Sequence, residues 1–409
     1  MSPRDQKLKQ VSSILAVPFL IGFSASVFAT NGILPLGNGM TAHGFGGAGI
    51  ANPGDAMAGT DNPALLAETG DQMAVGLTLF APHRSADIGT GAGYVDSDKN
   101  LFEIPSFGWT KTLTPKMNTG ILVTAMGGMN TTYPATLVGK ADFGIDLSGL
   151  IIAPTLSYAP DSDVAWGVSA LLGYEKLTTT LPAGSDSGTD SATGSGIKLG
   201  VSYHFSENTQ LGAFWQSRMK MGEMSKHCNG NGAFSLAKAL GITCEVNLPP
   251  MAGAGFKLNV SENGKLVMDV MHVAWSKVEL FRKAFGWEDQ NIFKFGYEYT
   301  VNSGLAVRYG VNYGPSPLNS EAIHQPGLPP GYLPQYPSGT PDSFPGAMAP
   351  AVSERHYAIG FTKKLGNNEL VGYYAFIPKV EQVDPGLDSA GNARVKMYQH
   401  ALGFGFNWK

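Results

Sequence analysis

Histidine, serine and carboxylate side chains could together carry out hydrolysis, but their arrangement in this chain does not support it. His204, His272, His356 and His400 fall on four separate apolar runs, and the sequence contains no GxSxG motif. A serine nucleophile needs a histidine and an acid or amide that converge on it. We therefore predict no catalytic residues and no enzyme activity.

A glycine pattern of the GxGxxG type is formed by Gly44, Gly46 and Gly49. In dinucleotide-binding domains this pattern follows a strand and opens a helix within a βαβ unit. Neither element surrounds it here, so we predict no nucleotide and no other cofactor. We instead expect these glycines to permit tight turns and close contact with a neighbouring wall.

The N-terminus has the three parts of an export signal. Arg4, Lys7 and Lys9 precede the apolar stretch Val11–Phe23, and Val27-Phe28-Ala29 fits a cleavage site for a signal peptide. We therefore assign residues 1–29 to a signal peptide and expect the mature chain to enter an oxidising compartment.

The only two cysteines, Cys228 and Cys244, stand in one long gap between apolar runs, and His227 precedes the first. Export favours a single disulfide between them. The alternative is a metal site that includes His227, but the spacing matches neither CxxC nor HxxxH. We predict the disulfide and no metal ion.

The chain contains runs in which apolar residues strictly alternate with other residues, and these runs must position the side chains discussed above. In Asn291–Val301, for example, Phe293 and Phe295 share one face while Lys294 lies on the other. Leu305–Tyr313 and Ile197–Phe205 repeat the pattern. Alternation with a period of two residues indicates strands with one apolar face. The runs reach about ten residues, which suits a tilted strand that crosses hydrocarbon.

The gaps between the runs are alternately short and long from Gln72 onwards. The short gaps are Thr114–Lys116, Asp161–Ser162, Ser206–Asn208, Ser261–Gly264, Asn302–Ser303 and Gly366–Asn368, and the long gaps are Arg84–Phe102, Met129–Asp146, Thr179–Thr193, Met221–Pro249, Val278–Gln290, Pro315–Ser353 and Val380–Val395. Tight turns on one side and long loops on the other are typical of outer-membrane barrels. These gaps separate fourteen strands. We therefore predict an all-β fold, a closed 14-stranded antiparallel transmembrane barrel over residues 72–409.

The composition agrees with a membrane barrel and argues against a nucleic-acid partner. Apolar residues make up 43% and charged residues 15% of the chain, and aromatic residues recur near the expected strand ends, as in an interfacial girdle. The formal net charge of −4 provides no basic field, so we expect no nucleic-acid partner.

Several apolar side chains fall on the face that should line the lumen. By parity these are Phe80, Leu122, Met126, Leu171 and Phe214; Met271 and Trp275 join them in Lys265–Lys277, where both faces are mostly apolar. They could pack against a plug or line a pocket for a hydrophobic solute, and the sequence leaves both interpretations open.

The leader over residues 30–71 lacks alternation and is rich in glycine and proline, so it cannot be a membrane strand. It contains Gly46-Gly47-Ala48-Gly49, an alanine-rich segment at Asp55–Ala58, and Asn62-Pro63-Ala64. In these motifs the chain resembles the FadL-type (OmpP1/FadL/TodX) outer-membrane transporters of long-chain fatty acids and other hydrophobic compounds. The fourteen-strand count extends the resemblance to nearly the whole mature chain.

The resemblance implies a monomer in the outer membrane of a Gram-negative bacterium, in contact with membrane lipid and lipopolysaccharide. Residues 30–71 would form a hatch inside the barrel, with Gly46, Gly47 and Asn62-Pro63-Ala64 as its motif. A hydrophobic solute would enter through an outer groove, for which we suggest Phe234 and Leu240. It would pass to a lumen pocket and leave sideways near a kinked third strand, Met117–Met126, where Gly127-Gly128 could break the pairing.

The ligand class stays open between fatty acids and aromatic hydrocarbons. A fatty acid would need a cation near its carboxylate, and the candidates Lys198, Arg218, Lys294 and Arg308 lie on the lumen side. The same cations could instead pair with Glu175 or Glu298. The alternative function is a water-filled diffusion porin, which would need an open, charged lumen.

Overall fold

The chain is described from a computed structural model that covers residues 31–88, 91–137, 142–180, 188–229, 238, 241–318, 347, 349–383 and 394–409. The predicted signal peptide and the two groove candidates, Phe234 and Leu240, lie outside these residues. Within them, no helix is both long and apolar enough to cross a membrane.

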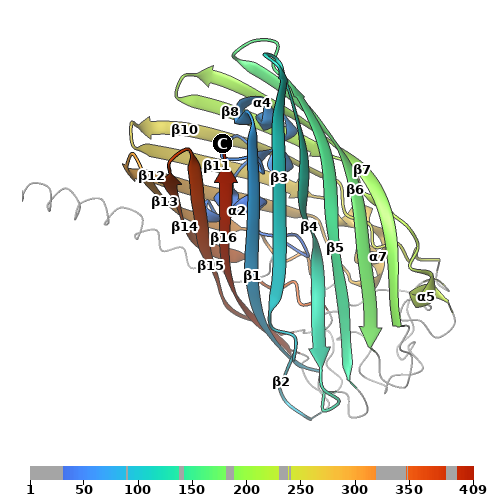
Figure 1. Ribbon diagram of the computed structural model, residues 1–409. Coiled ribbons are helices and arrows are strands. Elements are labelled where there is room, and N and C mark those ends of the chain that lie inside the picture. Colours follow the sequence, from blue (N-terminus) through green and yellow to red (C-terminus); the bar gives the residue numbers. More distant parts are fainter. Residues whose placement is uncertain are drawn as a thin grey trace, which may run out of the picture.

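Fourteen long antiparallel strands form the barrel (Figure 1). They are β1 (Gln72–Asp87), β3 (Phe102–Thr114), β4 (Met117–Tyr133), β5 (Phe143–Tyr158), β6 (Val164–Thr180), β7 (Gly188–Ser206), β8 (Thr209–Gln216), β10 (Met251–Ser261), β11 (Gly264–Val273), β12 (Gln290–Asn302), β13 (Leu305–Tyr313), β14 (Arg355–Leu365), β15 (Asn368–Val383) and β16 (Arg394–Trp408). Each pairs with the next, and β16 pairs with β1 from Met73↔Trp408 to Asp87↔Arg394, which closes the sheet. The predicted fourteen-stranded barrel is therefore confirmed.

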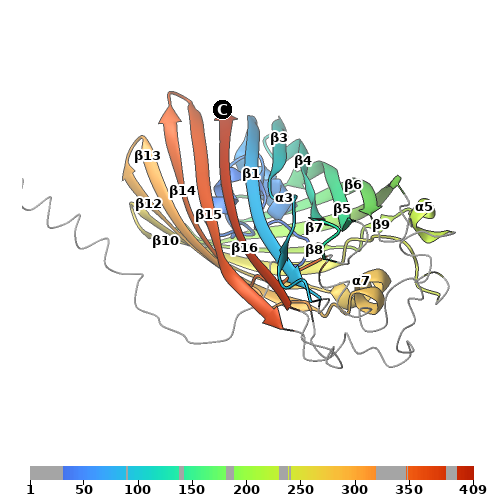
Figure 2. The same ribbon diagram turned by 90° about the horizontal axis from the view of Figure 1, so that it is seen from below.

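The structure also contains short strands and helices besides the fourteen barrel strands. Two-residue strands, β2 (Val95–Asp96) and β9 (Lys220–Met221), pair with β1 and β7. The helices within the hatch are α2 (Gly39–Gly44), α3 (Ala58–Asp61), η1 (Pro63–Leu65) and α4 (Leu66–Thr69), and those in the outer loops are α5 (Ser225–Cys228), η3 (Trp275–Lys277) and α7 (Glu279–Ala284). The view in Figure 2 looks into the barrel, where the hatch lies inside the ring of strands.

The alternation of the strands separates lipid-facing from lumen-facing side chains. On β12, Phe293 and Phe295 are 52% and 47% exposed on the outside, whereas Lys294 is 8% exposed on the inside. On β16, Leu402, Phe404 and Trp408 also face outward. An apolar exterior is what the hydrocarbon of the bilayer requires.

Several strands begin or end at residues other than those predicted from the gaps between the alternating runs. β1 runs on to Asp87, β4 reaches Tyr133, and β5 begins at Phe143, because beyond the hydrocarbon neither face needs to be apolar while backbone pairing continues. In contrast, β11 is shorter than the predicted run Lys265–Lys277. It ends at Val273, so Trp275 belongs to η3 and not to a lumen-facing strand.

Candidate functional site

The wall of the barrel opens between β3 and β4. The two strands pair only from Phe107↔Val123 to Thr114↔Met117. Further out, the residues from Phe102 to Ser106 pair with β1 alone, and β4 continues from Thr124 paired with β5 alone. Facing edges without backbone pairing leave a gap in the wall, which we call the β3–β4 window.

A β-bulge shapes the β4 side of this window. The register of β4 with β5 shifts between Ala125 and Gly127, and Gly127 has φ = +114°, a backbone conformation that L side chains rarely adopt. The extra residue is Met126, and it reverses the alternation: Leu122 and Met126 face inward, and after the bulge Met129 faces inward. The predicted break in pairing at Gly127-Gly128 therefore coincides with an actual bulge.

The first residues of the hatch meet the window at this bulge. The N–H of Gly128 donates to the carbonyl oxygen of Ile33 over 3.2 Å, and a Cβ on Gly127 would lie 2.3 Å from the same oxygen. The absence of a side chain at Gly127 thus lets the hatch touch the wall directly.

A short bridge closes the window on its outer side. The N–H of Ser97 donates to the carbonyl oxygen of Arg84 on β1 over 2.8 Å, and the N–H of Thr132 on β4 donates to Oγ of Ser97 over 3.0 Å. Asp98 adds a 2.7 Å hydrogen bond to the carbonyl oxygen of Thr132. The opening is therefore bounded on all sides.

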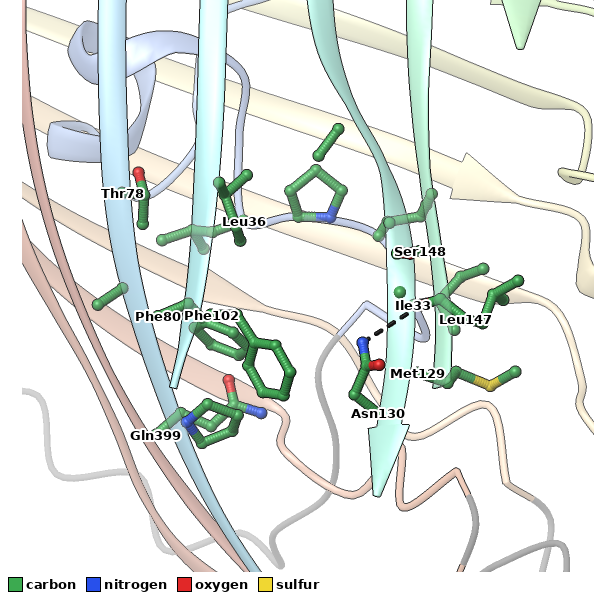
Figure 3. A pocket seen from close by; sticks show the side chains of 18 of the residues that line it. Ile33, Leu36, Thr78, Phe80, Phe102, Met129, Asn130, Leu147, Ser148 and Gln399 are labelled. Carbon is green, nitrogen blue, oxygen red and sulfur yellow. Dashed lines mark hydrogen bonds between the residues drawn. The ribbon is translucent and has the colours of Figure 1, made fainter. Parts of the chain in front are cut away.

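A cavity of about 490 Å³ lies behind the window. Its lining includes both edges of the window, with Phe102, Ile104 and Pro105 from β3, and it reaches Ile33 and Leu36 of the hatch. Figure 3 places Phe80 and Phe102 at one edge of the cavity and Met129 and Asn130 near the other. A largely apolar cavity of this size with few polar groups is typical of a small-molecule site.

Three polar residues of the cavity lining, His43, Thr78 and Tyr373, contact one another. His43 of the hatch stacks on Tyr373 at 4.4 Å between ring centroids, and the Tyr373 hydroxyl lies 2.9 Å from Oγ1 of Thr78. Nδ1 of His43 is 2.6 Å from the carbonyl oxygen of Gly39. Burial lowers the pKa of His43, so its imidazole is neutral at physiological pH.

A second, smaller cavity of about 90 Å³ lies between the hatch and the wall. Among its lining residues are four of the predicted lumen side chains: Met126, Leu171, Phe214 and Met271. It also includes Lys198 and Lys294, which donate to the hatch carbonyls of Thr60 over 2.6 Å and Gly47 over 3.0 Å. These cations hold the hatch in place.

The other predicted lumen residues have different surroundings. Phe80 lines the larger cavity, whereas Leu122 is fully buried against the hatch. Trp275 packs in an aromatic cluster with Phe281 and Trp287 in the outer loop between β11 and β12. Arg308 lines neither cavity, because it lies under the hatch and pairs with Glu298 at 2.6 Å. For Arg308 the pairing alternative therefore describes the structure.

The hatch motif meets the wall at close range. Gly46 and Gly47 have φ of +67° and +87°, and Gly46 lies against the backbone of β13. The Asn62 side chain donates to the carbonyl oxygens of Ile50 and Val201 over 2.9 Å each and accepts from the Ala64 N–H at 3.1 Å. Asn62 therefore both caps η1 and anchors it to β7.

Inward-facing glycines on ten strands form a belt around the hatch. The belt comprises Gly76, Gly108, Gly120, Gly167, Gly200, Gly212, Gly255, Gly296, Gly310 and Gly360, and a Cβ on any of them would lie under 3.0 Å from a hatch atom. The bore is therefore moulded to residues 40–66 of the hatch. This explains much of the abundance of glycine in the sequence.

The cysteines form a disulfide, with Cα atoms 5.9 Å apart. Both ring nitrogens of the neighbouring His227 lie 3.1 Å from Oγ1 of Thr179 and the carbonyl oxygen of Leu177. With its nitrogens engaged in this way, His227 is oriented as a structural residue and not as a metal ligand.

Some residues of the site escape the sequence patterns. Arg84, Phe102 and Asn130 line the larger cavity, but the sequence pattern places all three in the predicted long gaps Arg84–Phe102 and Met129–Asp146. The inward orientation of Arg84 could have been predicted, because Arg84 lies four residues after Phe80 and therefore points to the same face of the strand.

The chain was compared with known proteins. It matches the profile of the family described as outer membrane protein transport protein (OMPP1/FadL/TodX) over residues 24–326. No curated protein sequence matches it.

Solved structures with the same fold include a Pseudomonas aeruginosa FadL homologue, with a TM-score of 0.66 and 12% identity over 94% of this chain and 99% of the other. They also include the P. putida toluene transporter TodX, with 0.64, 16%, 91% and 98% for the same quantities, and the Ralstonia pickettii toluene transporter TbuX, with 0.63, 14%, 91% and 98%. The family match covers most of the chain, and the fold agrees along nearly its whole length. The chain belongs to the OMPP1/FadL/TodX family of outer membrane transport proteins, which are channels and not enzymes.

Proposed function

We propose that this protein takes up hydrophobic small molecules, such as long-chain fatty acids or aromatic hydrocarbons, and releases them sideways into the membrane. The observation that carries this proposal is that a single cavity is lined by both unpaired edges of the β3–β4 window. A lipophilic solute in that cavity has an apolar route into the bilayer, and the hydrophobic effect favours that route over periplasmic water.

The seating of the hatch counts against the alternative of a water-filled porin. A porin needs a continuous aqueous path, whereas the glycine belt brings the hatch into direct contact with ten strands. Lys198 and Lys294, which a porin would expose to its lumen, donate to hatch carbonyls instead.

We further propose residues 1–29 as signal peptide, 30–71 as hatch and 72–409 as barrel, and a monomer embedded among membrane lipid and lipopolysaccharide. The closed sheet supports the monomer, because among the described strands the long barrel edges are paired except at the β3–β4 window. The candidate groove residues Phe234 and Leu240 remain predictions.

A tryptophan beside the window should block the exit. Ala125 lies on the unpaired stretch of β4 and lines the cavity. In Ala125→Trp the indole should fill the gap between the strands, and uptake of a hydrophobic solute by cells should fall to the background of cells without the protein. Uptake of radiolabelled decanoate and of toluene measures this.

Ile121→Trp is the matched control. Ile121 also faces lipid on β4, but there the strand is paired with β3 at Trp109. This variant should transport normally. Equal uptake by Ala125→Trp and wild type would refute the lateral route.

A further inference from the structure

Arg84 is a buried cation in the wall of the larger cavity. It is 5% exposed, and no carboxylate of the described residues forms an ion pair with it. The other charged residues of the cavity lining, Glu103 and Lys176, are exposed. Isolated buried charges are costly unless they are paired, so the position of Arg84 calls for an anionic partner.

Arg84 reaches across the window from β1. Its Nη1 donates to the carbonyl oxygen of Asn130 on β4. Its guanidinium lies over the ring of Phe102 on β3, 5.5 Å from the centroid. The side chain is therefore held from both edges of the window, which fixes the plane of the guanidinium.

The remaining edge of this guanidinium has no partner among the described residues. Nε and Nη2 are buried and form no hydrogen bond within the described part of the chain. These two nitrogens make up one side of the planar fork, and that side can donate two parallel hydrogen bonds to the two oxygens of a carboxylate. A carboxylate could therefore bind without disturbing the bond to Asn130.

The height of Arg84 in the wall matches the head group of an amphiphile. Asn130 on β4 pairs with Asp146 on β5, which pairs with Thr178 on β6, and both of these neighbours are polar and face outward. The apolar exterior ends further in, at the pair Leu150↔Tyr174. The window thus begins at the edge of the hydrocarbon and extends outward to the polar interface.

We propose that Arg84 is the specificity-determining residue of the exit, and that it selects amphiphilic carboxylates and orients them for release. The carboxylate binds the Nε–Nη2 edge at the level of the interface, while the apolar chain passes through the inner part of the window into the hydrocarbon. The solute leaves tail first, in the orientation that it adopts in the bilayer. This inference rests on the proposed lateral route.

The test compares two solutes with the same chain, decanoate and decanol, and measures their Kd for the purified full-length protein in detergent. Arg84→Met keeps the apolar stem and removes the charge. Loss of a charge-assisted bidentate contact should raise the Kd of decanoate at least about tenfold, with the Kd of decanol changed less than about twofold. Arg84→Lys keeps the charge but not the planar fork, so its affinity for decanoate should lie between that of wild type and that of Arg84→Met.

Lys220→Met is the control, because Lys220 is an exposed cation outside the cavity lining, and this variant should leave both Kd values unchanged. An equal loss for both solutes in Arg84→Met, or an unchanged Kd of decanoate, would overturn the assignment. If Arg84→Met fails to fold, Arg84→Lys carries the test, because an affinity for decanoate equal to that of wild type contradicts the bidentate site. Binding does not depend on the exit, so uptake by Ala125→Trp tests the lateral route separately.

Discussion

Deletion of residues 31–71 should turn a closed barrel into an open pore. The hatch fills the bore at the level of the glycine belt, and the walls there carry almost no side-chain bulk of their own. Its removal would expose Lys198, Asp269 and Lys294, which now contact hatch backbone, to water. Ion conductance in planar bilayers should rise at least about tenfold, toward that of wide barrels with an aqueous channel.

The barrel itself should survive this deletion, because every strand keeps both of its neighbours. A barrel that still resists unfolding in detergent at room temperature would confirm this. A shorter deletion of residues 31–37 provides the control. It leaves the four hatch helices α2, α3, η1 and α4 in contact with the barrel wall, so conductance should stay low. A folded deletion variant with the conductance of wild type would rule out the hatch as the barrier.

The sequence predicts the barrel well because the bilayer imposes a simple pattern on it. Each strand must present apolar side chains to lipid at every second position, and this alternation fixes both the strand count and the inward parity of Leu122, Met126 and Phe214. The constraint ends at the membrane boundary. Beyond it the ladder continues without apolar alternation, which explains why the predicted ends of β1, β4 and β5 are wrong.

The hatch was predictable as a segment but only partly in its structure. Asn62 followed by Pro63 is typical of a helix start, and in the structure the Asn62 side chain caps η1 by accepting from the Ala64 N–H. By contrast, α2 forms in a segment rich in glycine, where intrinsic propensity is low. It is held by tertiary contacts with β14 and β15, which no local pattern reveals.

The site depends on contacts between distant segments, and the sequence indicates only one of its parts. Gly127-Gly128 suggests a break in pairing, and the bulge lies there. The partner of that bulge is the carbonyl of Ile33, far away in the chain, and the bond between Arg84 and Asn130 likewise joins separate strands. Such pairs follow from the closure of the barrel and not from the spacing of residues.

The second large effect should come from a single methyl group in the glycine belt. A Cβ on Gly310 would lie 2.0 Å from the backbone nitrogen of Gly46 and 2.1 Å from the carbonyl carbon of Phe45. Backbone atoms on both sides cannot move aside as a side chain can, and overpacking of this kind typically costs about 1–3 kcal/mol or more. Gly310→Ala should therefore displace the hatch, lower the unfolding temperature and raise conductance toward that of the deletion.

Gly173→Ala separates this effect from the general cost of substituting a strand glycine. Gly173 also faces inward, but its nearest neighbours are the flexible ends of Met219 and Met221. This variant should stay closed and nearly as stable as wild type. If Gly310→Ala has the same conductance and unfolding temperature as Gly173→Ala, close contact with the glycine belt does not hold the hatch in place.

The mechanism can be isolated by combining Gly310→Ala with the deletion of residues 31–71. The three atoms nearest to the methyl group all belong to Phe45 and Gly46 of the hatch, so in a barrel without the hatch the substitution should change neither conductance nor unfolding temperature. A large effect of the substitution on the intact protein and none on the deletion variant is the coupling expected of two groups in direct contact. A persistent effect would instead place the strain within the wall, between β13 and its neighbouring strands.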